Sequence, residues 1–368
     1  MEQFIMKTKV YMGKSALDHL KDFPMKRVFI ICDPFMLESG NVQHITDRLD
    51  MQKAVYEIFS DVVPDPDIHV VTEGIRRMLA FSPDMLIALG GGSAIDTAKS
   101  MRYISEQGMQ DRKMKLIAIP TTSGTGSEVT SFSVISDKEK NVKYPLRDDA
   151  MMPDVALLDP ELIVSVPASI TADTGMDVLT HAIEAFVSTR ACDFGDAFAE
   201  KTIRLVFSYL ADAVKCGEDR FARERIHNAS CMAGVAFNST SLGLCHSMAH
   251  ALGARFHISH GRSNALLLPH VITYNGAGAP DRYAELAKLL GISCSTKKAS
   301  VLGLVRKVTQ LMDKIGIPAK VDMLGISKEE FQAAIPELAE IALVDPCTQT
   351  NPRKPSKADI EQIYAKLI

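Results

Sequence analysis

Short runs of apolar residues alternate with longer amphipathic stretches through the first half of the chain. The runs RVFIICD (27–33), DMLIALG (84–90) and MKLIAIP (114–120) each end in Gly, Pro or Asp, as parallel strands buried on both faces commonly do. The stretches 70–81 and 93–107 have the apolar spacing of helices. This alternation predicts an α/β domain with a doubly wound, mostly parallel sheet, in which ligands bind beyond the carboxyl ends of the strands.

The pattern changes after Pro167, where runs of alternating β-branched residues become few. Long helical patterns cover 175–189, 196–215, 224–237, 243–253 and 281–290. We therefore predict two domains, an α/β domain at 1–167 and an all-helical domain at 168–368. No long flexible linker separates them, so we expect them to pack closely with a cleft between them.

The composition narrows the class of protein. Hydrophobic residues make up 46% and charged residues 23% of the 368 positions, which excludes disordered, collagenous and coiled-coil chains. A net charge of −4 offers no basic footprint for nucleic acid. No apolar run approaches the ~18–20 residues of a membrane helix, and the start MEQFIMKTKVYMG lacks the features of a secretory signal. The seven cysteines form no CxxC pair, so we expect a cytoplasmic protein without membrane or nucleic-acid partners.

A glycine-rich turn, GGGS at 90–93, connects one strand-like run to the helical pattern that follows. Free backbone N–H groups at a helix N-terminus attract phosphate, and glycine lets a ligand approach the backbone closely. Asp96 in the first helical turn can bind a ribose hydroxyl, or it can simply oppose the helix dipole. The turn is a candidate phosphate site, and a tight βα connection is the alternative.

A second polar loop, PTTSGTGSEVT at 120–130, follows the next strand-like run. It places hydroxyl groups around two glycines, among them Thr121, Thr122 and Thr125. A loop stabilised by local Ser and Thr turns is the alternative interpretation. Because two such loops follow strands of one predicted sheet, we interpret them together as a dinucleotide site.

Asp33 closes the strand-like run RVFIIC. A carboxylate at that place can bind the 2′-OH of an adenosine ribose and repels a 2′-phosphate, which favours NAD(H) over NADP(H). A helix N-cap is the equally weighted alternative.

Seven of the ten histidines lie between residues 181 and 270, in the helical half. Asp177 and His181 are four residues apart, so they project from one helix face, and His246 and His250 repeat that spacing. His260 follows fourteen residues after His246. One carboxylate with three imidazoles is a ligand set that suits Zn or Fe(II). Each pair alone is typical of a helix surface or core, but the whole array beside a candidate nucleotide domain favours a metal site at the domain cleft.

A divalent ion beside a nicotinamide polarises a carbonyl, or stabilises an alkoxide, while hydride passes between substrate and ring. A histidine that is not a ligand can pass the alcohol proton to solvent, and His250 is the natural candidate. His257 can line the pocket, whereas His227 and His270 are interpreted as structural.

Five stretches of the chain together resemble the iron-dependent (group III) alcohol dehydrogenase family. They span most of residues 84–271 and keep the order of the family. They are GGGSAIDTAK (90–99), PTTSGTGSEVT (120–130), PDVALLDPEL (153–162), TGMDVLTHAIEAF (175–187) and GLCHSMAHALGARFHISHGRSNALLLPHV (243–271). The stretch VPDPDIHVVTEGI (63–75) is also similar to the family, whereas residues 290–368 resemble it only loosely.

The resemblance implies the dehydroquinate synthase-like fold of this family and assigns roles to single residues. It implies that the helical domain holds the metal and the substrate, with His250 relaying the proton. The implied metal ligands are Asp177, His181, His246 and His260. The implied cofactor contacts are Asp33, Gly90, Gly91, Gly92, Ser93, Asp96, Thr121, Thr122, Thr125 and Lys143.

The activity that the resemblance implies is interconversion of short aldehydes and primary alcohols with NAD(H) and Fe(II), with Zn as the alternative metal. Within the family the chain is most similar to the branch of 1-propanol dehydrogenases of propanediol and ethanolamine utilisation. That branch is associated with bacterial microcompartments, so microcompartment enzymes are the implied partners, and the enzyme is expected inside the compartment or free in the cytoplasm. We also expect a homodimer or higher homo-oligomer formed through the N-terminal strand region.

Three other functions remain open at this point. A lyase similar to dehydroquinate synthase shares the architecture, the nucleotide and the metal, but it needs a basic pocket, and the segment around His250 and Arg255 offers few Lys or Arg residues. A glycerol or 1,2-diol dehydrogenase is closer in chemistry, although it normally lacks the full four-ligand pattern. A non-enzymatic zinc scaffold predicts a closed site with no open coordination position.

Overall fold

The computed structural model describes residues 3–64, 66–108, 114–137, 139 and 142–368, and for residues 142 and 143 it describes the backbone alone. It divides into two compact units. One is Ile5–Ser165, and the other is Val166–Ile368 together with Gln3 and Phe4. The domain limits of 1–167 and 168–368 stay a prediction. None of the helices in the described part of the chain combines the length and the apolar character that a bilayer span requires.

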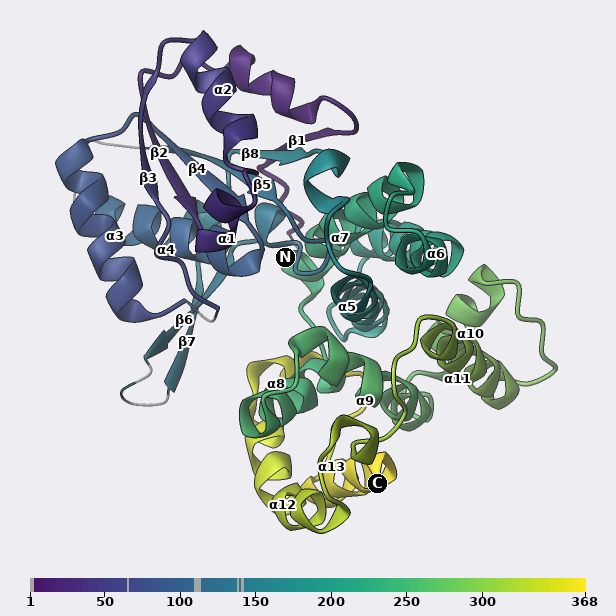
Figure 1. Cartoon of the computed structure of the whole chain (residues 1–368). Coiled ribbons are helices and arrows are strands. Elements are labelled where there is room, and N and C mark those ends of the chain that lie inside the picture. Colours follow the sequence, from purple (N-terminus) through teal and green to yellow (C-terminus); the bar gives the residue numbers. More distant parts are fainter. Residues whose placement is uncertain (1–2, 65, 109–113, 138, 140–141) are drawn as a thin grey trace. The chain divides into compact units, whose positions relative to one another are not determined.

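The first unit is built on a six-stranded sheet in which all paired neighbours run parallel (Figure 1). The strands are β1 (Lys9–Met12), β2 (Arg27–Cys32), β3 (Val55–Phe59), β4 (Met85–Gly90), β5 (Lys115–Pro120) and β8 (Val155–Leu158). Their order across the sheet is β1-β8-β5-β4-β2-β3. The predicted parallel sheet is confirmed, and the strands β1, β3 and β8 join the three that the apolar runs predicted.

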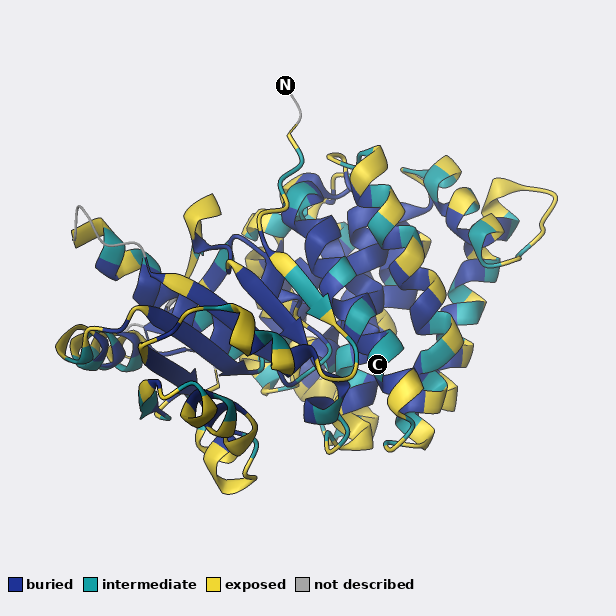
Figure 2. Cartoon of the chain, turned by 90° about the horizontal axis from the view of Figure 1, so that it is seen from above, coloured by how far each residue is buried: buried dark blue, intermediate teal, exposed yellow. Residues whose placement is uncertain are grey.

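Helices cover both faces of this sheet because successive strand residues point to opposite sides. Val28 and Ile30 of β2 belong to one core cluster, and Phe29 and Ile31 belong to the other. All four are fully buried, and Figure 2 shows the central strands in the colour of buried residues. The first cluster includes η1 (Ala16–Asp22), α1 (Pro34–Glu38) and α2 (Gln43–Met51), and the second includes α3 (Ile68–Phe81) and α4 (Gly92–Gly108). Each large apolar side chain buried in this way contributes about 1.5–3 kcal/mol.

An antiparallel hairpin that the sequence patterns did not predict follows the sheet strand β5. It pairs β6 (Phe132–Asp137) with β7 (Val142–Arg147). The Ser133 hydroxyl of β6 lies 2.7 Å from that of Ser100 and donates to the carbonyl oxygen of Asp96 at 2.9 Å, which ties the hairpin to α4. The short helices of this unit are η2 (Ser127–Val129), η3 (Asp149–Met151) and η4 (Pro160–Ile163).

The second unit is helical throughout its described elements, as predicted. Its central helix is α5 (Ala168–Val187), which is buried along most of its length. The other helices are α6 (Asp193–Lys215), α7 (Arg220–Thr240), α8 (Leu244–Phe256), α9 (His260–Asn275), α10 (Pro280–Leu289), α11 (Lys297–Lys314), α12 (Lys328–Val344) and α13 (Lys357–Tyr364), with η5 (Asp322–Leu324), η6 (Pro346–Thr350) and η7 (Ala365–Leu367). Helices α5, α8 and α9 carry the candidate metal ligands.

Candidate metal centre and dinucleotide loops

Three helices of the second unit bring four predicted ligands to one point. Asp177 and His181 lie one turn apart on α5, and His181 Nδ1 is 4.0 Å from Asp177 Oδ2. The Nε2 atom of His246, on α8, lies 3.6 Å from Asp177 Oδ1, and that of His260, at the start of α9, lies 3.5 Å from the same oxygen. One candidate ligand atom from each of the four residues lies within 4.8 Å of the others. The sequence spacing anticipated the two pairs, and the packing of α5 on α8 and α9 joins them.

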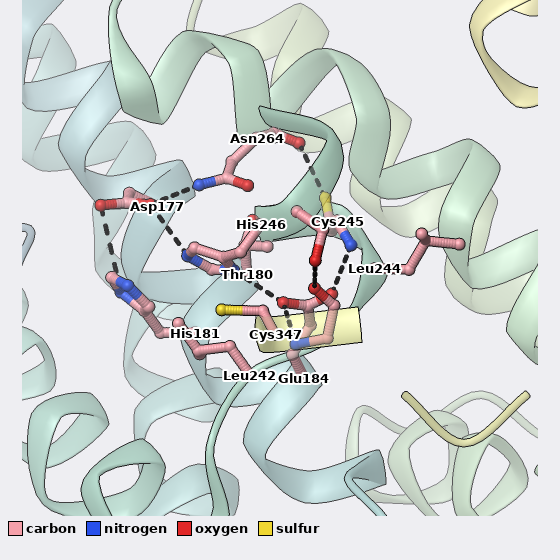
Figure 3. Close-up of polar contacts among 12 residues, drawn as sticks. Asp177, Thr180, His181, Glu184, Leu242, Leu244, Cys245, His246, Asn264 and Cys347 are labelled. Atoms are coloured by element: carbon pink, nitrogen blue, oxygen red, sulfur yellow. Dashed lines mark hydrogen bonds and ion pairs between the residues drawn. The ribbon is translucent and has the colours of Figure 1, made fainter. Parts of the chain in front are cut away.

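Two nitrogens of this cluster are buried without a hydrogen-bond partner among the described residues. They are His181 Nδ1 and His246 Nε2, and each lies only at ion-pair distance from Asp177, as the dashed lines of Figure 3 show. An unsatisfied buried polar atom is costly, so a native structure that retains two side by side needs a reason for them. A cation shared with the Asp177 carboxylate supplies that reason, because imidazole nitrogens and a carboxylate oxygen suit Fe(II) or Zn. The residues therefore fit a metal ion.

Burial and neighbouring charges shift the pKa values of the cluster residues in different directions. Burial alone raises the pKa of Asp177, but the imidazoles of His181 and His260 outweigh it and hold that pKa far below its ordinary range. Burial lowers the pKa of His181 to about 3, so its ring is neutral and keeps a lone pair for a cation. Burial also lowers the pKa of His246, but the carboxylates of Asp177 and Glu184 outweigh this effect and bring it to about 9.

His250 lies one helical turn beyond His246, and its side chain is 44% exposed. Its Nδ1 atom is 2.8 Å from Asp345 Oδ2, and its ring stacks on that of His260 with the centroids 5.3 Å apart. The hydrogen bond from His250 outweighs the raising effect of burial and lowers the pKa of Asp345 to about 2, so the carboxylate is charged. Asp345 is itself held by the Cys347 backbone N–H at 2.8 Å and by the Ser247 hydroxyl at 3.1 Å. His250 is therefore oriented by a fixed carboxylate and remains open to solvent.

Sequence reasoning missed two carboxylates of this region. Glu184 lies seven residues after Asp177 on α5, and its two oxygens accept from His246 Nδ1, Gly243 N and Cys245 N. The spacing 177, 181, 184 places three polar residues on one face of a mostly apolar helix, which is a signal that could have found it. Asp345 carries no such signal, because it lies 95 residues from His250 in the chain.

The three remaining histidines of the helical half lie outside the four-ligand cluster. His257 ends α8 in a left-handed conformation, with φ 56°, and is exposed. Burial lowers the pKa of His227 to about 4, and burial together with nearby lysines does the same for His270. These neutral rings agree with the structural interpretation of both residues.

Helices α5 and α9 approach so closely that a methyl group at Gly261 would overlap the Asp173 carbonyl oxygen and lie 3.3 Å from Asp177 Cβ. We expect Gly261→Ala to push these helices apart and to reduce the free energy of unfolding by about 1–3 kcal/mol, which denaturant unfolding measures. Gly108→Ala is the matched control, because a methyl group there meets nothing within 4 Å. Equal stability of the two variants would contradict this account of the contact.

The predicted phosphate loops lie together in the first unit. Strands β2, β4 and β5 are neighbours, so Asp33, the turn 90–93 and the loop 121–125 all follow carboxyl ends of adjacent strands. A methyl group added at Gly91 would lie 3.2 Å from Thr122 Oγ1, and one at Gly92 would lie 2.8 Å from Thr125 Cγ2. A side chain at either position would therefore have to displace a threonine of the second loop, which lies against the start of α4.

The other predicted cofactor contacts have partners within this unit. The Asp33 carboxylate accepts from Met36 N at 3.2 Å, so it caps α1, and this leaves its second oxygen available. Asp96 accepts from the Ser127 hydroxyl at 2.5 Å and from Val134 N at 3.1 Å, and burial raises its pKa. Lys143 belongs to β7, and its side chain lies outside the described part of the chain. The cofactor roles of these residues stay predictions.

Two family models match the chain in succession. The model of iron-containing alcohol dehydrogenases matches residues 7–160, and the model of the C-terminal part of the Fe-containing alcohol dehydrogenase family matches residues 171–368. A curated relative, the 1-propanol dehydrogenase PduQ of Salmonella typhimurium, is 45% identical over 373 residues, and the match covers all of both chains.

Solved structures show the same likeness over the whole chain. An alcohol dehydrogenase from Oenococcus oeni has a TM-score of 0.94 and 32% identity, with complete coverage of both chains. A sulfoacetaldehyde reductase from Bifidobacterium kashiwanohense in complex with NAD+ has a TM-score of 0.89 and 29% identity, covering 100% of this chain and 98% of that one.

Proposed function

The chain belongs to the iron-containing alcohol dehydrogenase family, and on this basis we propose that it interconverts short-chain aldehydes and primary alcohols with NAD(H). The observation that carries the proposal is the buried cluster of one carboxylate and three imidazoles, with two unsatisfied nitrogens, beside the half-exposed His250. Family membership confirms the resemblance seen in the sequence motifs and leaves the dehydroquinate-synthase-like lyase without support.

We propose Asp177, His181, His246 and His260 as the ligands of Fe(II). A divalent ion held by these residues supplies a Lewis acid for the oxygen of the aldehyde or alcohol. The neutral His181 ring and the charged Asp177 carboxylate provide lone pairs for it without further proton loss. These four side chains would hold the ion, and it would act on the substrate only if it also accepted the substrate oxygen, which a closed zinc scaffold would not do.

The dinucleotide is proposed to bind at the carboxyl ends of β2, β4 and β5. Bound NAD(H) supplies the hydride acceptor or donor. The N-terminus of α4 offers backbone N–H groups to a diphosphate. The predicted contacts are those named from the family resemblance, Asp33, Gly90, Gly91, Gly92, Ser93, Asp96, Thr121, Thr122, Thr125 and Lys143.

His250 is proposed to carry the proton between the substrate oxygen and solvent. Its Nδ1 atom is engaged by the Asp345 carboxylate, so its Nε2 atom is the one that can exchange a proton. Because the side chain is 44% exposed, water can reach the ring. His250 therefore has both properties that a relay needs, a fixed orientation and contact with solvent.

We propose propionaldehyde and 1-propanol as representative substrates, since a full-length relative at 45% identity is named a 1-propanol dehydrogenase. Purified protein is expected to oxidise NADH with propionaldehyde, to lose this activity on chelation, and to recover it when Fe(II) or Zn is restored. Activity that survives complete metal removal would contradict the proposal. A higher kcat/KM for glycerol or 1,2-propanediol than for 1-propanol would instead support a polyol dehydrogenase.

We expect Asp33→Gly to narrow or reverse the preference for NAD(H) over NADP(H). The substitution removes a carboxylate that accepts from a ribose 2′-OH and repels a 2′-phosphate. It also removes the cap of α1, which costs a few tenths of a kcal/mol when glycine replaces an aspartate. Asp33→Ser keeps a capping oxygen and removes the charge, so the same shift in both variants assigns the effect to the charge. Equal kcat/KM for both cofactors in the unsubstituted protein would contradict the prediction.

The edge of the sheet offers a surface through which two copies of the chain can associate. Strand β1 lies at one edge of the described sheet, where its backbone can pair with a second copy, and we propose a homodimer or higher oligomer, which light scattering measures. We also propose an association with microcompartment enzymes, which co-purification with compartment shells tests.

A further inference from the structure

Glu184 is a buried carboxylate next to the metal cluster that the proposed chemistry does not use. Its side chain is 3% exposed, and both of its oxygens are engaged (Figure 3). Oε2 accepts from His246 Nδ1 at 2.6 Å and from Gly243 N at 2.9 Å, and Oε1 accepts from Cys245 N at 2.6 Å. A buried charge is tolerated only when it is paired and hydrogen-bonded, so this arrangement needs all three donors.

These contacts determine which nitrogen of His246 carries hydrogen. Backbone N–H groups can only donate, and the two that meet Glu184 occupy acceptor sites on both of its oxygens. His246 Nδ1 must then hold a hydrogen and donate it to Glu184. With Nδ1 holding its hydrogen, Nε2 is the atom at which a cation can take the place of a proton, and it is buried, lacks a hydrogen bond and lies 3.6 Å from Asp177 Oδ1.

The same carboxylate also fixes the helix that carries His246. Gly243 is the N-cap of α8, and Cys245 lies in its first turn. Glu184, on α5, therefore ties the start of α8 to the helix that carries Asp177 and His181. Rotation of α8 about its axis would break these contacts together with the bond to the His246 ring.

We propose that Glu184 is a positioning residue of the metal centre, which holds His246 in the tautomer and orientation that present Nε2 to the cation. The inference rests on the proposed ligand role of His246. Carboxylates that accept from the second nitrogen of a metal-bound histidine raise its basicity and fix its ring, and their loss typically weakens metal binding about 10–100-fold.

The test is Zn²⁺ affinity of the metal-free protein, measured by competition with a chelating indicator and without any substrate or cofactor. Glu184→Gln replaces one carboxylate oxygen by an NH₂ group, which donates and cannot accept. The glutamine side chain therefore cannot accept from all three N–H groups. We expect the Kd for Zn²⁺ to rise about 10–100-fold. The matched control is Asp196→Asn, which alters a part-buried carboxylate of the same unit that accepts from Arg282 and lies in neither metal-capable cluster of the described residues. It is expected to leave that Kd unchanged.

A purely structural role for Glu184 predicts a different result. If Glu184 only caps α8, Glu184→Gln lowers the Tm of the metal-free protein but leaves the Zn²⁺ affinity as in the unsubstituted chain, and this outcome overturns the inference. Should Glu184→Gln fail to fold, Glu184→Asp keeps the charge but withdraws it from His246, and the same weakening is expected. Failure of the unsubstituted protein to bind stoichiometric Zn²⁺ would instead overturn the proposed metal site.

Discussion

His246→Ala is expected to lower kcat/KM for propionaldehyde by about 10³-fold or more, because it removes a ligand and with it most of the Lewis-acid contribution of several kcal/mol. The loss of metal affinity should exceed the roughly 10–100-fold that removal of an outer-shell partner costs. The substitution also removes the hydrogen bond between His246 Nδ1 and the buried Glu184 carboxylate, which is 2.6 Å long. Metal analysis of the purified variant, together with steady-state kinetics, measures both effects.

The control for this variant is His270→Gln. His270 lies on α9, ten residues beyond His260, and takes no part in the cluster. The His270→Gln variant is expected to bind stoichiometric metal and to turn over normally. If His246→Ala keeps its metal and near-normal turnover, the ligand assignment is wrong.

His250→Gln is expected to lower turnover by about 10²–10⁴-fold, the usual contribution of a positioned proton-transfer group. Glutamine retains a polar side chain of similar reach but cannot exchange a proton. His250 lies beside His246 and His260, with ring centroids 6.2 and 5.3 Å away, yet its Nδ1 bonds Asp345. Metal content and NADH binding are therefore expected to stay unchanged while kcat falls.

Metal content and turnover of His250→Gln separate the alternatives. Loss of the metal would identify His250 as a ligand, and normal turnover would show that water or another group carries the proton. Arg255→Gln, an exposed substitution on the same helix, is the control for effects of altering α8 as such. It is expected to retain metal, NADH binding and turnover.

The strands that the sequence predicted are buried on both faces, whereas β8, which is also fully buried, has only four residues and was not predicted. Val28 to Cys32 and all residues of β4 are buried, so each strand is a continuous apolar run. The edge strands β1 and β3 are short and mostly exposed or half-buried, and the hairpin strand β6 is buried at only part of its positions. Edge strands lack the continuous run because only part of each strand meets the core. Their place in the sheet follows from pairing with distant segments.

In the second unit, the helical periodicity of the sequence likewise predicted some of the helices and missed others. It predicted parts of α5 to α8 and α10 but not α9, α11, α12 or α13. The i, i+4 pairs of candidate ligands could be predicted because a helix places such residues on one face whatever its surroundings. Glu184, three residues after His181, was visible by the same rule and was overlooked.

What the sequence by itself determined is therefore local, namely the alternation of buried strands and helices, the glycine turn after β4, and the pairs Asp177/His181 and His246/His250. Each of these depends on backbone geometry over a few residues. Only the tertiary structure decided that His260 joins the first three ligands, that Glu184 bonds His246, and that Asp345 orients His250 across 95 residues. Contacts between segments far apart in the chain depend on how helices pack, and the spacing of residues along one helix carries no information about its neighbours.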